Sequence, residues 1–120
     1  MTSSSFIDDD RLPVIPLRYK NLNQLYKSFM PFLKNGGLFI PTAKPYHMGQ
    51  EVLMLIRFPN EDFKTQAEGF VVWVTPMDST NHKKQGVGIE FSDENGIIVL
   101  SKIKSLLSER IGTDAPTYTL

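Results

Sequence analysis

The sequence predicts a mainly β fold: a small antiparallel barrel or curled sheet followed by one C-terminal helix. Short apolar runs separated by Gly, Pro and polar turns fill residues 12–91, as strands of a compact β domain do. One amphipathic helical pattern follows at residues 92–112. A chain of 120 residues suffices for one core. We therefore expect a single domain over 12–112, between a disordered segment at 1–11 and a polar tail at 113–120.

Composition narrows the class of function. Thirteen Lys and Arg balance thirteen Asp and Glu, and a chain without net charge gains little from releasing the counterions of a nucleic acid. The absence of Cys excludes disulfides and thiolate nucleophiles. No apolar run approaches the roughly 20 residues of a membrane span, and the N-terminus lacks the pattern of a secretory signal. We expect a soluble, cytoplasmic protein.

The N-terminal part contains one strand and one short helix. Residues 12–19 alternate apolar side chains with Pro13 and Pro16, which predicts an edge strand or an extended arm because Pro lacks a ladder donor. Asn21 can cap a helix that Pro31 ends. The apolar residues at helical spacing after Asn21 are Leu22, Leu25, Tyr26 and Phe29.

A pair of glycines marks the next reversal of the chain. Asn35-Gly36-Gly37 lies between two short apolar runs, Phe32-Leu33 and Leu38-Phe39-Ile40. Because Gly tolerates positive φ, the stretch predicts a tight hairpin between two strands. Pro41 places the second strand at an edge or a turn.

Three longer strands follow. Residues 51–58 are almost continuously apolar, which predicts a strand covered on both faces, and 59–62 predict a turn. In the strand at 66–74, strict alternation places Trp73 on the face of Ala67, Gly69 and Val71. In the strand at 86–91, Val87, Ile89 and Phe91 share a face, and the glycines opposite leave room for a close neighbour.

The last predicted element is an amphipathic helix. Capping residues lie at 92–95, and Gly112 stands where a glycine ends many helices. Its expected core side chains are Val99, Ile103, Leu106, Leu107 and Ile111.

No catalytic set is visible. His47 and His82 show neither metal-ligand nor triad spacing, and Asp8-Asp9-Asp10 lacks the spacing of a calcium loop. Gly86-x-Gly88 lacks the third glycine and the following helix of a dinucleotide fingerprint. We expect no enzymatic activity, no cofactor and no metal.

Three stretches together resemble the PilZ domain family: residues 35–39 (NGGLF), 68–74 (EGFVVWV) and 86–91 (GVGIEF). Their order, with a helix at the end, covers about residues 12–111 and implies a six-stranded antiparallel β-barrel. Residues 26–32 and 114–120 resemble more narrowly the PilZ subfamily of type IV pilus biogenesis, which lacks the cyclic di-GMP motifs.

Many members of this family bind cyclic di-GMP through the motifs RxxxR and [D/N]xSxxG. With Gly37 at the final glycine, Phe32 stands at the Asp or Asn position and Lys34 at the Ser position. Phe32 offers no hydrogen bond, and the Lys34 ammonium has no acceptor. Upstream, Arg11 and Arg18 have the wrong spacing. We therefore expect no binding of cyclic di-GMP.

The resemblance implies an adaptor that connects the pilus-extension ATPase (PilB) with a FimX-like regulator carrying an EAL domain, and we expect it to be a monomer. Candidate partner-binding residues are Tyr26, Trp73, Pro116 and Tyr118, since aromatic residues are favoured as interface anchors. Trp73 fits equally a tryptophan that closes the core, and Tyr26 fits helix packing. The alternative is a divergent cyclic-dinucleotide receptor that uses Lys34, Arg18 and Lys20.

Overall fold

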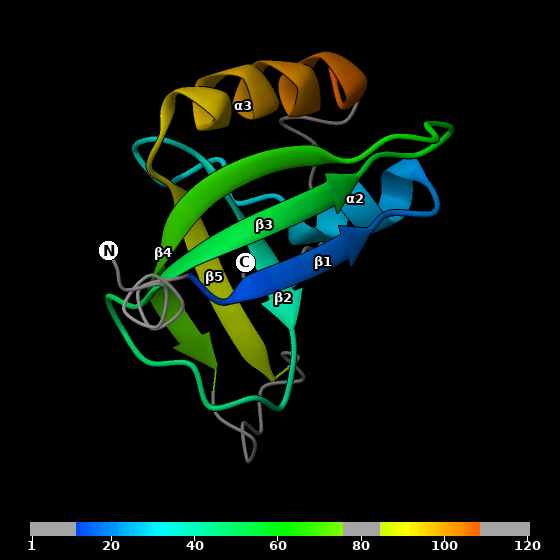
Figure 1. The fold of residues 1–120 in the computed structure, drawn as a ribbon. Coiled ribbons are helices and arrows are strands. Elements are labelled where there is room, and N and C mark those ends of the chain that lie inside the picture. The colour runs from blue at the N-terminus through cyan, green and yellow to red at the C-terminus, as the bar shows by residue number, and fades with distance from the viewer. Residues whose placement is uncertain (1–11, 76–84, 109–120) are drawn as a thin grey trace, which may run out of the picture.

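The computed structural model describes residues 12–75 and 85–108. The segment 1–11 and the tail 113–120 lie outside these residues, so their predicted states are not addressed. In chain order, the described elements are β1 (Val14–Arg18), α2 (Leu22–Ser28), β2 (Gly37–Pro41), β3 (Glu51–Arg57), β4 (Thr65–Thr75), β5 (Gly86–Phe91) and α3 (Glu94–Leu106) (Figure 1).

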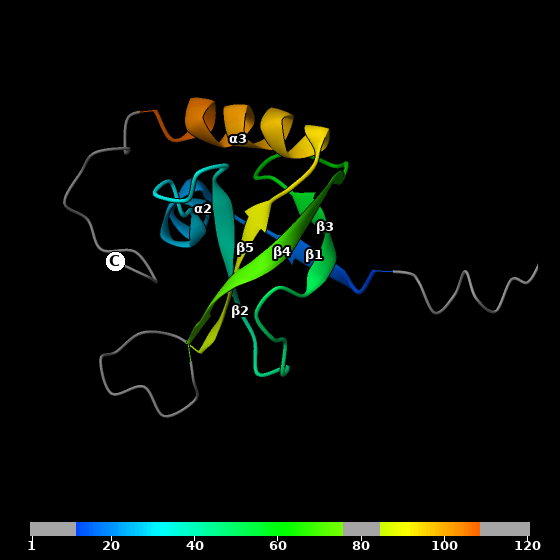
Figure 2. The ribbon, with the colours of Figure 1, turned by 90° about the vertical axis from the view of Figure 1, so that its left-hand side faces the viewer.

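The five described strands form one curled sheet in the order β1-β3-β4-β5-β2. The helix α3 packs on β4 and lies across one end of the sheet, as two perpendicular views show (Figures 1 and 2). The predicted mainly β fold with a C-terminal helix is therefore confirmed. A closed, six-stranded barrel is not seen in the described residues, because β1 and β2 are the two edges of the sheet.

The strand predicted before the glycine pair is absent. Residues 31–35 form turns, and the only strand pairing between α2 and β2 is an isolated bridge between Phe29 and Leu38. The Met30 amide donates to the Gly37 carbonyl at 2.9 Å, which closes the reversal. Pro31 follows directly and has no amide to continue a ladder. The chain reverses here, as predicted, but through a wider loop than a tight hairpin.

The prediction of a wholly antiparallel sheet is also wrong. β1 pairs in parallel with β3, with Val14 beside Leu53 and Arg18 beside Arg57. A parallel pair needs a long crossover, and residues 19–50, which include α2 and β2, provide it. β1, which contains Pro16, lies at the edge of the sheet, as the sequence predicts.

Both helices begin at the predicted capping residues. The Asn21 side chain accepts a hydrogen bond from the Gln24 amide, and the Asp93 carboxylate accepts one from the Gly96 amide, each at 2.9 Å. α3 ends earlier than predicted, because Leu107 has ψ near 14° and leaves the helical conformation. Ile111 and Gly112 lie outside the described residues.

The core fills the concave side of the sheet and the underside of the two helices. In β3 the side chains alternate strictly, so Val52, Met54 and Ile56 are buried. Leu53 and Leu55 point to the opposite face and are only half-buried, which contradicts the prediction that both faces are covered. The buried core residues are Ile15, Tyr19, Leu25, Phe29, Leu38, Ile40, Val52, Met54, Ile56, Phe58, Ala67, Val71, Val87, Ile89, Phe91, Val99, Ile103 and Leu107.

A β-bulge in β4 overturns the predicted position of Trp73. Val71 pairs with Ile89, but Trp73 pairs with Gly88, so Val72 is the extra residue. An extra residue in one strand reverses its inside–outside alternation. Val71 is buried in the core, whereas Trp73 lies on the other face of the sheet beside Gly88.

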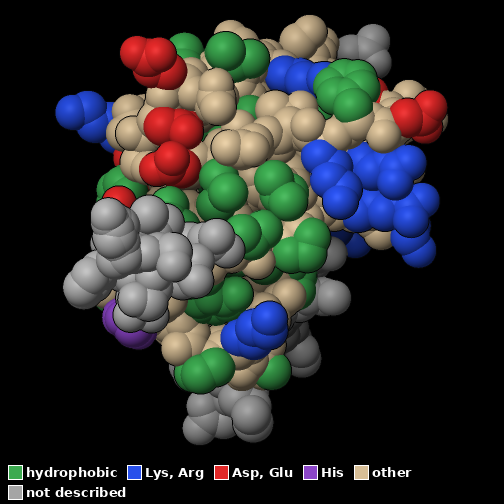
Figure 3. Space-filling model, viewed as in Figure 1, with side chains coloured by type: hydrophobic (Ala, Val, Ile, Leu, Met, Phe, Trp, Pro, Cys, Tyr) green, Lys and Arg blue, Asp and Glu red, His purple; other side chains and the backbone are tan. Residues whose placement is uncertain are grey.

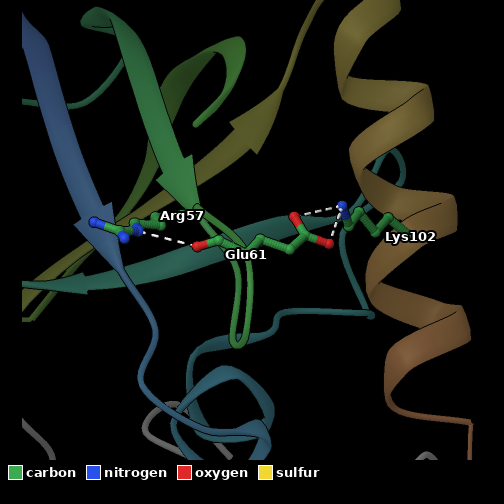
Figure 4. A network of polar contacts seen from close by, with 3 residues as sticks. All are labelled: Arg57, Glu61 and Lys102. Atoms are coloured by element: carbon green, nitrogen blue, oxygen red, sulfur yellow. Dashed lines mark hydrogen bonds and ion pairs between the residues drawn. The ribbon is translucent and has the colours of Figure 1, made fainter. Parts of the chain in front are cut away.

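The turn between β3 and β4 fastens α3 to the sheet through Glu61. The Glu61 carboxylate contacts Lys102 Nζ of α3 at 2.6 Å and 2.7 Å, and its backbone carbonyl accepts from Arg57 Nε at 3.1 Å (Figure 4). Lys102 Nζ also lies 4.8 Å from the ring centroid of Phe58. One turn residue thus joins the end of β3 to the helix.

We expect Gly37→Ala to lower the free energy of unfolding by about 2 kcal/mol or more, as overpacking beside a rigid backbone does. A Cβ at Gly37 would collide with the carbonyl oxygen of Ile89 in β5. Gly49→Asn is the control, because Gly49 has φ of 84° and open space around it, and Asn tolerates positive φ. Urea unfolding measures both, and equal losses would contradict this account.

Candidate functional site

A small apolar cluster lies on the face of the sheet opposite the core. We define the outer cluster as Met30, Phe32, Phe39 and Trp73. Gly88 of β5 makes room for it, because a Cβ there would meet Met30 Sδ and Trp73 Cβ. Phe39 of β2 is the cross-strand neighbour of Gly88. The prediction that the glycines of β5 leave room for a close neighbour is therefore confirmed.

Phe32 and Trp73 form the exposed part of the outer cluster. Their ring centroids are 6.1 Å apart with the planes tilted by 58°, a favourable aromatic arrangement. The Trp73 indole Nε1 donates to Thr75 Oγ1 at 2.8 Å, so its polar atom is satisfied. Phe32 remains 44% exposed and Trp73 is half-buried. The pair presents aromatic surface to solvent, with Trp73 on the strand β4 and Phe32 on the loop between α2 and β2.

The positions of the degenerate nucleotide motif have other roles in this structure. The Phe32 ring packs on Trp73, and Lys34 is exposed in the loop between α2 and β2. Asn35 ties this loop to β5 through its amide and side chain, which donate to the Glu90 carboxylate at 3.2 Å and 3.0 Å. Gly37 is set by the close approach of β5. Packing alone therefore explains the glycine.

The other predicted partner-binding residues do not gather at one site. Tyr26 of α2 is half-buried and packs against the main core, which agrees with the helix-packing alternative. Pro116 and Tyr118 lie outside the described residues. Phe32 was missed as a partner of Trp73. A bulge hides this contact from pattern reasoning, since alternation places Trp73 in the core.

A cationic cleft lies at the ends of β1 and β3. Arg18, Lys20 and Arg57 line it together with Asn60, Glu61 and Asp62, and its volume is about 380 Å³. Figure 3 shows Lys and Arg side chains gathered at this side of the molecule. Lys34 lies elsewhere, in the α2–β2 loop, so the three cations of the receptor alternative are not brought together. Arg57 was missed because its neighbour Arg18 is distant in sequence.

Side chains of the types that bind metals do not cluster in the residues that the structure describes. These residues contain no group of three or more His, Cys, Asp or Glu side chains that could hold a metal ion. His47 is exposed, and His82 lies outside the described ranges. In the described parts of the chain, we find no helix with the length and apolar character needed to cross a bilayer.

The curled sheet, the C-terminal helix and the glycine-lined β5 define a small, mainly β domain. The family model of the PilZ domain matches residues 12–109, so this chain belongs to the PilZ domain family. PilZ domains are in general non-catalytic regulatory or adaptor domains. No curated protein matches the chain.

We expect Phe32→Ala to shift the fluorescence of Trp73 to longer wavelength with less than about 1 kcal/mol lost in stability, because Phe32 is half-exposed and outside the main core. The chain has a single Trp, so its emission reports on this cluster alone. Ile98→Ala on α3 is the control and leaves the emission unchanged. An unchanged emission in Phe32→Ala would show that the two rings are not in contact.

Proposed function

We propose that this protein is a non-catalytic adaptor of type IV pilus assembly and twitching motility. It works in the cytoplasm as a monomer and binds the pilus-extension ATPase (PilB) and a FimX-like regulator with an EAL domain. It does not itself bind cyclic di-GMP. The pilus subfamily and its partners come from the resemblance of residues 26–32 and 114–120, and the family match supplies the adaptor class.

The observation that carries the proposal is the state of the nucleotide motif. The side chain at its first position, Phe32, packs on Trp73, and the Lys34 side chain stands exposed with donors only. A ligand that needs directed hydrogen bonds from these positions meets an aromatic ring and an ammonium group. The same ring pair offers a protein partner an apolar anchor.

The alternative is a divergent cyclic-dinucleotide receptor, and the cleft with Arg18, Lys20 and Arg57 favours it. Guanidinium groups bind phosphates well. Two observations weigh against it: Lys34 lies in a different loop, and Asp62 places a carboxylate 3.7 Å from Arg57 Nη2.

Isothermal titration calorimetry separates the two functions. We expect a saturable heat signal when the protein is titrated with the N-terminal region of the pilus-extension ATPase, and none with cyclic di-GMP. Lys34→Glu leaves the ATPase signal nearly unchanged in the adaptor, whereas it abolishes dinucleotide binding in the receptor. A micromolar response to cyclic di-GMP alone would overturn the proposal.

We expect Trp73→Ala to weaken the ATPase complex by about tenfold or more, because a rigid aromatic anchor is lost. Ile98→Ala, another exposed apolar residue at 63% exposure, is the matched control and leaves the affinity unchanged. Circular dichroism verifies that both variants fold. Normal binding by a folded Trp73→Ala protein would show that Trp73 is only structural.

We expect deletion of residues 113–120 to leave thermal unfolding almost unchanged and to impair the partner complex. The prediction comes from the resemblance of Pro116, Tyr118 and their neighbours to the pilus subfamily. Differential scanning calorimetry and the same titration measure the two effects. A large fall in the melting temperature would instead make the tail part of the core.

A further inference from the structure

The outward face of β1 and β3 carries apolar side chains that no described element covers. The parallel register places Val14 beside Leu53 and Pro16 beside Leu55. Val14 is 51% exposed, Pro16 is exposed, and the two leucines are half-buried. Figure 3 shows hydrophobic side chains gathered over these strands. We call these four residues the apolar face.

Such a face is unusual on a free sheet. A strand with one solvated face normally alternates apolar and polar residues, whereas a continuously apolar strand is typical of a sheet covered on both sides. β3 has the second pattern, and the main core covers only its inner residues, Val52, Met54 and Ile56. A contiguous apolar patch rimmed by polar residues marks an interaction site.

The apolar face ends at a pair of arginines. Arg18 and Arg57 are neighbours in the register, on the same outward side as Val14 and Leu53. Like charges side by side on adjacent strands repel each other. Among the described residues, Asp62 is the carboxylate that pairs with Arg57, at 3.7 Å and fully exposed, a weak pair. This pair, with Lys20 in the same cleft, favours an acidic partner.

The nearest other carboxylate does not neutralise the arginines. Glu61 gives only its backbone carbonyl to Arg57, and its carboxylate binds Lys102 on the opposite side of the turn (Figure 4). The hydrogen bond to Nε also orients the Arg57 guanidinium, whose terminal nitrogens meet only the weak, exposed contact with Asp62. Fixed, partly buried guanidinium groups bind carboxylates bidentately.

We infer that the apolar face and the Arg18–Arg57 pair together bind an amphipathic helix of a protein partner, with apolar side chains on the face and a carboxylate between the arginines. A helix about 10 Å wide spans two strands about 4.8 Å apart. Addition of a strand at the β1 edge is disfavoured, because Pro16 has no amide to donate.

The spacing on the sheet specifies the sequence pattern of that helix. Val14 and Arg18 are four residues apart in β1, which corresponds to about 13 Å along a strand. In an α-helix this distance corresponds to about nine residues, and the nearest positions on the same stripe of the helix are i+7 and i+8. The partner therefore has apolar residues at positions i and i+4, and Glu or Asp at i+7 or i+8, on one stripe.

A designed pair of peptides tests the surface directly. Each is an alanine-based helix with Leu at i and i+4, and one carries Glu at i+7 and i+8 where the other carries Lys. In a nuclear magnetic resonance titration of the full chain, we expect the Glu peptide to shift the amide signals of Val14, Leu53 and Arg18, and to bind at least tenfold more tightly than the Lys peptide.

Two variants of the protein sharpen the test. Arg18→Glu with Lys20→Glu reverses the preference between the peptides, and Val14→Asp weakens both. The matched controls are Lys104→Glu and Ile97→Asp, exposed positions on α3 that leave the binding unchanged. Equal affinity for the two peptides, shifts confined to α3, or no shifts at millimolar peptide would each overturn the inference. So would concentration-dependent shifts of these amides without peptide, because a second copy would then occupy the face.

The inference rests on the adaptor function proposed above, but it fails separately. If the ATPase region binds the Val14→Asp and Arg18→Glu variants as tightly as the unmodified protein, this surface is not its site, although the adaptor function stands. If the Glu peptide binds and the ATPase region does not, the surface stands and the proposed partner is wrong.

Discussion

The close packing of neighbouring strands around β5 is the constraint on which this structure depends. β5 pairs with β4 on one side and β2 on the other, so its backbone is fixed on both edges. Its inward residues Val87, Ile89 and Phe91 belong to the core. Two of its outward residues, Gly86 and Gly88, have no side chains, so neighbouring side chains must fill that part of the face. Dense packing does not tolerate an empty row along a central strand.

The outer cluster is the consequence of that row. Phe39 lies over Gly86, and Met30 and Trp73 meet at Gly88. Trp73 can reach this place only because the bulge at Val72 reverses the alternation of β4. In a regular strand the indole would point into the core beside Val71. The bulge in β4 turns the single Trp from the interior to an accessible face of the sheet, and the glycines of β5 provide the space that it occupies there.

The sequence alone predicts those elements that have a strong local signal. The bounds of β5 and the capping residues Asn21 and Asp93 follow from residue type and period alone. The parallel pairing of β1 and the position of Trp73 do not, because pairing partners and bulges depend on tertiary contacts. The same limit applies to the site. Phe32 was recognised as a lost ligand position, but its packing on Trp73 depends on the bulge.

The net charge, like the residue pattern, does not predict how the surface is arranged. Equal numbers of acidic and basic residues argue against a polyanionic ligand for the whole molecule, yet they do not fix where the charges lie. Glu61 decides this locally: its carboxylate neutralises Lys102 under α3, and only its carbonyl reaches Arg57. The ends of β1 and β3 therefore remain cationic in a chain that is neutral overall. Because exposed charges act over about one Debye length, roughly 8–10 Å in physiological salt, this local excess governs which partner approaches the apolar face.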